Sequence, residues 1–379
     1  MLDTHELGDR IALCKNWFIN SGIQERNIHS ANFGGLYAWF DAINQKYPFV
    51  YSEITGYGIT AFIFLHHLSG ENVFIKRAED AAQWLIKEAI FSPQLAYRCK
   101  YFPEEKSFLN HLCSFDNSMI LTGLSLLSEK HNTSIYKERA IALGDWLVNT
   151  MQKSDGSFHP NWEAGRGKFI ETLQKWSTQA GSFHAKHAIG LLNLYRITGK
   201  RLYKESAIRL CDWSLSQQGE DGRFITNASD GSTNQHPHCY ACEGLLYAGI
   251  SLKEPKYVQA ARKGMLWSLS SQLANGGFPS AYKDGGFVNI ERMDILAQIM
   301  RLALLCGQRG EKIKKAFDRL FRFQVLDDSR QKGGFRYGFI EGGTEVPHIN
   351  AWVSMFALQA MIYYHDILQG KEVSAECFI

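Results

Sequence analysis

Histidine side chains stand near the start of three of the most apolar segments of this chain. His184 lies in FHAKHAIGLLNLYRITG, His236 and His238 open HPHCYACEGLLYAGISL, and His348 lies at the start of PHINAWVSMFALQAMIYY. Imidazole suits proton transfer because its ordinary pKa lies near neutral pH. A lone histidine beside an apolar helix is usually a core residue, but equivalent positions in three segments indicate a shared site. We therefore predict His238 and His348 as an acid and base pair, with His184 beside them.

Carboxyl, amide and guanidinium groups occupy the corresponding positions of the other apolar segments. When six such segments are aligned at their centres, Glu53, Asp116, Asn117, Glu291 and Arg292 lie six to eight residues earlier. Acidic and amide side chains are also favoured there as helix caps, and capping explains each carboxyl or amide as well as a functional role does. The predicted catalytic residues are His238, His348, Asp116 and His184. The predicted substrate-binding residues are Glu53, Tyr57, Asn117, His187, His236, Tyr240, Glu291, Arg292, Asp294, Asn350 and Trp352.

Cysteines and glycines give no further site. Cys239 and Cys242 form a CxxC beside two histidines, but on a helix only one or two of these side chains share a face, and no second CxxC exists. We expect buried thiols there and no metal ion. Gly285 and Gly286 have no phosphate-loop pattern around them, so no nucleotide and no other cofactor is predicted.

A sixfold repeat positions these residues. In five units an amphipathic stretch has a tryptophan near its end, and all six lead into a turn rich in helix breakers, such as SDGSF, EDGRF, NGGF and KGGF. Asp-Gly and Gly-Gly pairs mark turns because they tolerate positive φ angles. A second, more apolar stretch follows, and units recur roughly every 50 to 70 residues, a plausible length for a helical hairpin with its loops. The tryptophans are Trp17, Trp84, Trp146, Trp213 and Trp267.

The two stretches of each unit differ in character. The first has one apolar stripe, which predicts an outer helix, and the second is apolar nearly all round, which predicts a helix buried on both sides. Six such pairs predict an all-α fold, a single (α/α)6 toroid over residues 1–379, with small hairpins at the rim. The inner helices then run parallel, so the predicted site residues converge at one end of the ring. Six helix N-termini gather there and favour anionic or hydroxyl-rich ligands.

Composition restricts the partners. The formal net charge of +3 is too small to indicate nucleic acid or a membrane surface. Aromatic residues make up 13% of the chain, which suits stacking on sugar rings, although a large core needs aromatics too. Eight scattered cysteines are typical of free thiols in a reducing compartment. With no secretory signal and no apolar run that spans a bilayer, we expect a cytoplasmic location and no membrane insertion. The oligomeric state stays open.

The six-hairpin plan with QxxDGSF-type turns resembles the six-hairpin glycosidase superfamily, which includes N-acylglucosamine 2-epimerases, unsaturated uronyl hydrolases and toroidal polysaccharide lyases. YSEITGYGI, QHPHCYACEGLLYAG and RMDILAQIMRLALL are similar to toroids associated with bacterial surface-polysaccharide biosynthesis, and the resemblance runs over nearly the whole chain. The epimerases use inner-helix histidines as acid and base on a ring-opened sugar. The resemblance matches His238 and His348 to that pair and His184 to an accessory site. The glutamate that follows the first histidine by about one turn is missing.

The other members of the superfamily imply other roles. A hydrolase of this fold uses a carboxylic acid near an inner-helix start, which Asp116 or Asp294 matches. A lyase needs a group that neutralises a uronate, which Arg292 matches. We therefore predict an enzyme that acts on a sugar or oligosaccharide by acid–base chemistry, in the order epimerase or isomerase, hydrolase, lyase.

Two alternatives stay open. Terpene cyclases and prenyltransferase β-subunits are also α/α toroids, but the DxDD motif usual in cyclases is absent. A tightly bound zinc ion, held in prenyltransferases by an Asp, Cys and His set, would favour the latter. The second alternative is a non-catalytic saccharide-binding scaffold, which predicts that replacing His238 and His348 leaves function intact.

Overall fold

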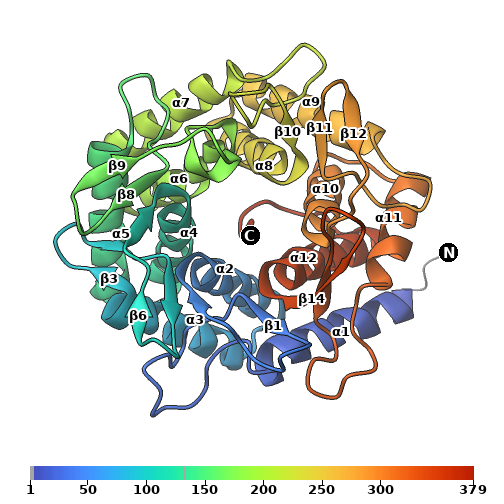
Figure 1. The fold of residues 1–379 in the computed structure, drawn as a ribbon, viewed down its shortest axis with the longest axis horizontal. Helices are drawn as coiled ribbons and strands as arrows, with labels where there is room; N and C mark the ends of the chain where they lie inside the picture. Colours follow the sequence, from blue (N-terminus) through green and yellow to red (C-terminus); the bar gives the residue numbers. More distant parts are fainter. Residues whose placement is uncertain (1–3, 132) are drawn as a thin grey trace.

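Two concentric rings of helices make up the fold (Figure 1). The computed structural model describes residues 4–131 and 133–379, and within them twelve α-helices alternate between the rings. The inner ring consists of α2 (Ser52–Ser69), α4 (Ser114–Lys130), α6 (His187–Thr198), α8 (Gln235–Leu252), α10 (Met293–Leu305) and α12 (Ala351–Leu368). The outer ring consists of α1 (Thr4–Asn20), α3 (Asn72–Trp84), α5 (Ser134–Trp146), α7 (Arg201–Leu215), α9 (Pro255–Ser270) and α11 (Glu311–Phe321). The predicted (α/α)6 toroid is confirmed.

Burial explains which helix lies in which ring. In α4 every residue from Ser114 to Leu127 is buried, as expected of a helix packed on both sides. In α11 the buried residues recur three and four positions apart, so one stripe faces inward and the charged face meets solvent. Among the described helices, none is long and apolar enough to cross a membrane.

A glutamine and a glycine join neighbouring outer helices. Gln152 Nε2 donates to the Gly156 carbonyl at 3.1 Å and to the Ser206 carbonyl of α7 at 3.0 Å. Gly156 has a φ of +95°, and a Cβ there would lie 2.5 Å from the Arg209 carbonyl oxygen, so only glycine fits. The same pairing closes the ring, because Gln324 Nε2 donates to the Arg10 carbonyl of α1 at 3.0 Å. Gln24, Gln218 and Gln272 make equivalent bonds.

Small antiparallel sheets frame the end of the ring where the inner helices begin. Strands β2, β7, β10 and β14 each run directly into an inner helix, which confirms the predicted hairpins at the rim. The five sheets of the described chain are β1 (Trp39–Asp41) with β14 (Glu345–Asn350) and β13 (Phe335–Phe339); β2 (Val50–Tyr51) with β5 (Lys100–Phe102) and β6 (Ser107–Phe108); β3 (Ile90–Phe91) with β4 (Ala96–Tyr97); β7 (His111–Cys113) with β8 (Asn161–Glu163) and β9 (Lys168–Ile170); and β10 (Thr233–Asn234) with β11 (Ala281–Lys283) and β12 (Gly286–Val288).

Three predicted helix starts are corrected by these elements. His348 lies on β14 rather than in the first turn of α12. Arg292 and Glu291 precede α10, with Arg292 as its N-cap residue. His184 lies in a short 3-10 helix, η4 (Ser182–Lys186), that leads into α6. Helical periodicity could not separate these residues from the helices because the preceding strands and turns are short.

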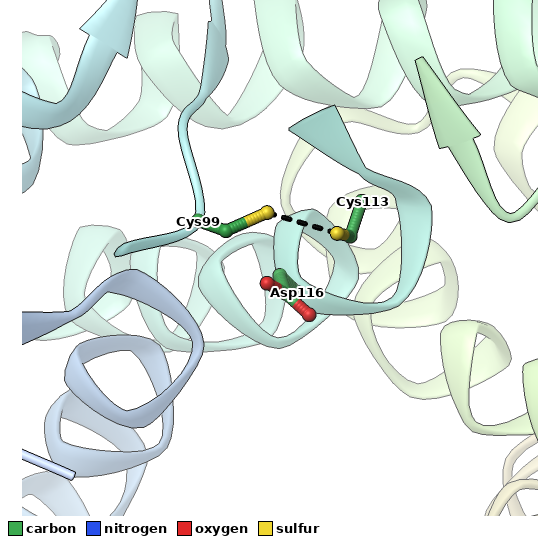
Figure 2. Close-up of side chains that lie close together, drawn as sticks. All are labelled: Cys99, Cys113 and Asp116. Carbon is green, nitrogen blue, oxygen red and sulfur yellow. Dashed lines mark hydrogen bonds between the residues drawn. The ribbon is translucent and has the colours of Figure 1, made fainter. Parts of the chain in front are cut away.

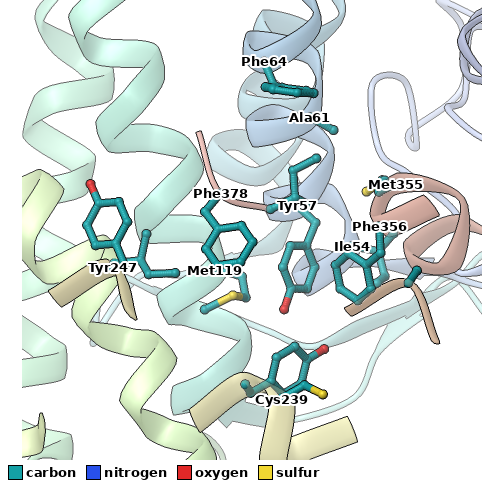
Figure 3. Packing of buried hydrophobic residues seen from close by; sticks show 14 of the residues in the cluster. Ile54, Tyr57, Ala61, Phe64, Met119, Cys239, Tyr247, Met355, Phe356 and Phe378 are labelled. Carbon is teal, nitrogen blue, oxygen red and sulfur yellow. The ribbon is translucent and has the colours of Figure 1, made fainter. Parts of the chain in front are cut away.

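The opposite end of the ring is closed by the last residues of the described chain, which enter its centre (Figure 1). Glu243 pairs with Lys186 at 2.6 Å and with Arg301 at 2.6 Å, and all three side chains are buried. Both cations also donate to the Ile379 carbonyl, at 3.1 and 2.5 Å. Phe378 lies in the central core (Figure 3), with the Arg301 guanidinium 4.9 Å from its ring centre. Lys186 is therefore part of the interior, although lysine side chains usually reach toward solvent.

Candidate functional site

A cavity of about 510 Å³ lies at the end of the ring where the inner helices start. First turns of inner helices and the rim strands supply its walls, as expected if the predicted site residues converge. Its polar and aromatic lining includes Tyr51, Glu53, Lys100, His111, Asp116, Trp176, His184, His236, Tyr240, Arg292 and Trp352. A larger hollow of about 810 Å³ lies on the outer side, beside α1, and none of the predicted site residues lines it.

His236, in the first turn of α8, is held in one tautomer. Its Nδ1 lies 2.7 Å from Gln298 Oε1 and 3.4 Å from Asp294 Oδ2. Both oxygens can only accept, so Nδ1 carries the proton and Nε2 keeps the lone pair. Gln298 is oriented in turn by Glu243, to which its Nε2 donates at 3.4 Å. Burial lowers the pKa of His236 to about 4, so the imidazole is neutral near pH 7.

Asp294 links this histidine to the cavity wall. Its carboxylate accepts from Arg292 Nε at 3.2 Å and Nη2 at 2.5 Å, and from Trp352 Nε1 at 3.3 Å. Burial raises the pKa of Asp294, but the adjacent guanidinium and His236 outweigh it, and the pKa lies below its ordinary value. The carboxylate is therefore ionised, and it fixes the Trp352 indole and the Arg292 fork at the edge of the cavity.

Two carboxyl groups lie on the other side of the lining. Burial, followed by the charge of Asp116, raises the pKa of Glu53 to about 8. Burial also raises the pKa of Asp116 well above its ordinary value, and its Oδ2 is buried without a hydrogen-bond partner. The thiols of Cys99 and Cys113 lie beside Asp116 (Figure 2). Glu53 therefore keeps its proton at neutral pH, and burial favours the protonated form of Asp116 unless a cation lies beside it.

His184 lines the cavity, whereas its neighbour His187 lies behind it. His184 Nδ1 accepts from the Gly181 backbone at 3.4 Å, and its Nε2 lies 3.4 Å from Ser114 Oγ. Burial lowers the pKa of His184 to about 3, so this imidazole stays neutral. Neither ring nitrogen of His187 has a partner among the described residues, and burial holds its pKa well below the ordinary value.

His238 and His348, predicted as the acid and base pair, lie outside the cavity lining. His238 is buried toward the outer ring, where Nδ1 accepts from the Phe224 N–H at 3.2 Å and Nε2 lies 3.0 Å from the Gly264 carbonyl. Both nitrogens are thus used by the backbone, which is the bonding of a structural histidine. His348 stacks on Trp39 with ring centres 4.5 Å apart. The structure does not bring the two imidazoles together over the pocket.

Three further predicted residues also lie outside the lining. Glu291 forms a double hydrogen bond with Arg319 of α11, at 2.8 and 2.9 Å. Asn117 bonds both backbone groups of Tyr97, at 2.8 and 2.9 Å. Asn350 caps α12, accepting from the backbone three residues on at 3.1 Å. These contacts are the capping and packing roles that the sequence left open as an alternative.

The two predicted tyrosines divide between the core and the pocket. Tyr57 is 2% exposed and packs edge-on against Phe356 with ring centres 5.5 Å apart (Figure 3). Tyr240 lines the cavity one turn after His236, with ring centres 4.5 Å apart. Lys186 Nζ lies 4.9 Å from the ring centre of Tyr57 and 4.5 Å from that of Tyr240, so the rings separate the cation from the pocket.

Sequence reasoning missed the lining residues that the rim strands and their flanks supply, because these strands are too short for a periodic signal. It also assigned no role to Gln298, in the middle of α10, although the amide of this residue sets the His236 tautomer. A polar side chain in the middle of an apolar helix was the available signal. The missed lining residues include Tyr51, Cys99, Lys100, His111 and Cys113.

No protein-family model matches this chain, and no curated protein matches its sequence. Its fold is similar to solved sugar-active enzymes. Cellobiose 2-epimerase from Bacillus thermoamylovorans B4167 has a TM-score of 0.79 at 11% identity, over 95% of this chain and 98% of that chain. D-mannose isomerase has a TM-score of 0.75 at 11% identity, over 97% and 98%. A family 88 glycosyl hydrolase from Bacteroides vulgatus has a TM-score of 0.65 at 12% identity, over 96% and 99%. At these identities the similarity shows the common (α/α)6 fold.

Proposed function

We propose that this chain is an enzyme that moves protons on a saccharide bound in the pocket, with His236 as the base. The hydrogen-bond chain from Glu243 through Gln298 to His236 carries the proposal, because it leaves the lone pair on Nε2 of a neutral imidazole. Trp176, Trp352 and Tyr240 supply aromatic surfaces of the kind that stack on sugar rings.

The reaction best supported is epimerisation or isomerisation of a ring-opened sugar. His236 Nε2 removes the proton from the carbon next to the carbonyl, and the bonding electrons move toward the carbonyl oxygen to give an enediolate. A carboxyl group from across the ring, Glu53 on α2, returns a proton to the other face or to the neighbouring carbon (Figure 1). The TM-scores of 0.79 and 0.75 with an epimerase and an isomerase, against 0.65 and 0.66 with a hydrolase and a lyase, favour the same order.

The competing reactions fit the pocket less well. A lyase needs a cation for the uronate, and Arg292 is already paired with Asp294, which leaves Lys100 and Lys175 of the lining for that role. A hydrolase could use the carboxyl groups of Glu53 or Asp116, and it remains the second candidate because both line the pocket. Isoprenoid binding calls for apolar walls, whereas here buried carboxyls, imidazoles and cations share one lining.

The cellular setting belongs to the same proposal. All eight cysteines are free, which suits a reducing compartment such as the cytoplasm. The resemblance of YSEITGYGI and RMDILAQIMRLALL to polysaccharide-biosynthesis toroids supports a role in making or remodelling bacterial surface saccharides.

Proton NMR in D2O with a panel of hexoses, disaccharides, N-acetylhexosamines and uronides tests the reaction. We expect deuterium to enter a C–H position, and His236→Gln to slow this exchange about a hundredfold to ten-thousandfold with the circular dichroism unchanged. His348→Gln is the matched control and should retain the exchange. Glycosidic cleavage would indicate the hydrolase instead. Exchange that survives His236→Gln but disappears in His348→Gln would refute the assignment, and saccharide binding without turnover would favour a scaffold.

A further inference from the structure

Two thiols and a carboxyl converge in the wall of the pocket. The sulfurs of Cys99 and Cys113 and a carboxyl oxygen of Asp116 all lie within 4.8 Å of one another (Figure 2). All three residues line the same cavity. We infer that they form a zinc site in which the fourth ligand position opens to the cavity. The reaction proposed above does not depend on this site, since metal binding is measured without turnover.

The fold brings the three donors together from two segments. Cys113 ends β7 and is the N-cap residue of α4, and Asp116 follows three residues later in its first turn, so the two share one face of the helix start. Cys99 directly precedes β5, and its backbone N–H donates to the His111 carbonyl at 3.1 Å. That bond fixes Cys99 against β7 and places its Sγ 2.8 Å from Cys113 Sγ.

The buried carboxyl oxygen of Asp116 indicates that a cation binds here. The Asp116 side chain is 4% exposed, yet among the described residues Oδ2 has no hydrogen-bond partner. A buried carboxylate oxygen without a partner is costly. A zinc ion between the carboxylate and the thiolates removes that cost.

The donor set selects the metal. Thiolates favour zinc among the common divalent ions, and zinc accepts a carboxylate as a further ligand. Tetrahedral zinc with bonds of about 2.3 Å to sulfur holds two sulfurs about 3.8 Å apart, so Cys99 and Cys113 must separate by about 1 Å. Three protein ligands and one open position are the arrangement of a catalytic rather than a structural zinc ion. Bound there, zinc would polarise a sugar oxygen that reaches it from the cavity.

Two other interpretations of Cys99, Cys113 and Asp116 account for fewer of these contacts. A disulfide between Cys99 and Cys113 would leave the Asp116 oxygen without a partner. The zinc set of prenyltransferases contains an Asp, a Cys and a His, whereas here a second thiol stands in place of the imidazole. His111 lies on the same face of β7 as Cys113, two residues earlier, and lines the cavity, so it adds a nitrogen donor near the open position.

Cobalt(II) titration of the full-length protein tests the site. The protein is reduced, stripped with a chelator, and titrated while thiolate-to-cobalt charge-transfer absorption is recorded; zinc is then added in competition. We expect one equivalent of cobalt with the intensity of two thiolates, displaced by zinc. Cys99→Ser and Cys113→Ser should each remove at least half of the absorption, and Asp116→Asn should weaken binding at least tenfold. Cys306→Ser, which alters a half-buried thiol outside the lining, should leave the titration unchanged.

The outcomes separate the two proposals. Absence of the charge-transfer band in the reduced protein, or equal binding by Cys99→Ser and Cys306→Ser, overturns the zinc site. A Cys99–Cys113 disulfide that forms in air and leaves no cobalt binding after reduction also overturns it. If a serine variant unfolds, Asp116→Asn with an intact circular dichroism spectrum decides the matter. Metal binding without sugar turnover sustains the zinc site and counts against the reaction. Turnover by a protein that binds no cobalt after reduction sustains the reaction and overturns the zinc site.

Discussion

The two ends of the ring interior differ in whether their buried polar groups have hydrogen-bond partners. At the closed end, Glu243 binds Lys186 and Arg301, and both cations also reach the Ile379 carbonyl. At the pocket end, a buried oxygen of Asp116 lacks a partner and His236 Nε2 keeps a lone pair. Buried polar groups that bond to one another stabilise the ring. Buried polar groups that lack a partner in a cavity can instead bind a ligand.

The two ends are also connected. Glu243 and His236 lie seven residues apart on α8, about two helical turns, so they share a face. Gln298 of α10 bridges them, donating to Glu243 and accepting from His236. Glu243 of the closed end therefore helps to set the tautomer of His236, the proposed base.

Replacing the central anion of the closed end should give the largest effect. Glu243→Gln leaves Lys186 and Arg301 buried without a counter-charge, and we expect a loss of about 3–5 kcal/mol in the free energy of unfolding by urea. The control is Glu129→Gln, which breaks the partly exposed pair with Arg196 and should cost at most about 1 kcal/mol. Equal losses in the two variants would show that the closed end is not the stabilising element described here.

Cutting the connection between the ends should affect catalysis more than stability. Gln298→Leu removes the nearer acceptor of His236 Nδ1–H and leaves Asp294 Oδ2 at 3.4 Å, so the imidazole is held less firmly in one tautomer and orientation, and we expect kcat/KM to fall about a hundredfold. The acid limb of the kcat/KM profile, which reports protonation of His236, should shift as well. A large loss of stability with an unchanged pH profile would indicate a packing role only.

The architecture could be predicted because it repeats. The tryptophan near the end of an outer helix, the glycine turn and the apolar inner helix recur along the chain, and each copy supports the interpretation of the others. Convergence of the inner-helix starts followed from topology. Asp116, His184, His236, Arg292 and Trp352 indeed line the cavity.

Side-chain direction was the part that could not be predicted. His236 and His238 are two residues apart on one helix, so they point to different sides, and no sequence pattern indicates which of them faces the pocket. The answer depends on the carbonyl of Gly264 in α9 and on the Phe224 backbone, both remote in sequence. Cys99 and Cys113 lie 14 residues apart without a metal-binding spacing, and their sulfurs meet because the Cys99 backbone N–H bonds the His111 carbonyl.

A substitution at Gly156, where two outer helices are joined, should lower the stability of the fold without affecting either end of the ring interior. Gly156→Ala forces a Cβ into the Arg209 carbonyl at a φ of +95°, and we expect a loss of about 2 kcal/mol in the free energy of unfolding. Gly8→Ala is the control, because nothing lies near its Cβ in α1 and alanine should stabilise the helix by about 0.5–1 kcal/mol. The kcat of the folded Gly156→Ala enzyme should stay unchanged. A fall in kcat would mean that this junction between outer helices also affects the geometry of the pocket.

The two histidines of α8 should contribute equally to the pH dependence of stability, whereas turnover should distinguish them. Burial lowers the pKa of both His236 and His238 from 6.5 to about 4. Between these values the unfolded chain binds protons that the native state excludes, so each histidine lowers stability by about 1.4 kcal/mol per pH unit as pH falls from 6.5 toward 4. His236→Gln and His238→Gln should each reduce this slope by one proton in urea unfolding at pH 4.5 to 6.5. Only His236→Gln should slow turnover by about a hundredfold or more, because only its Nε2 keeps a lone pair beside the cavity. If one of the two variants leaves the slope unchanged, the histidine replaced in that variant is protonated in the folded protein.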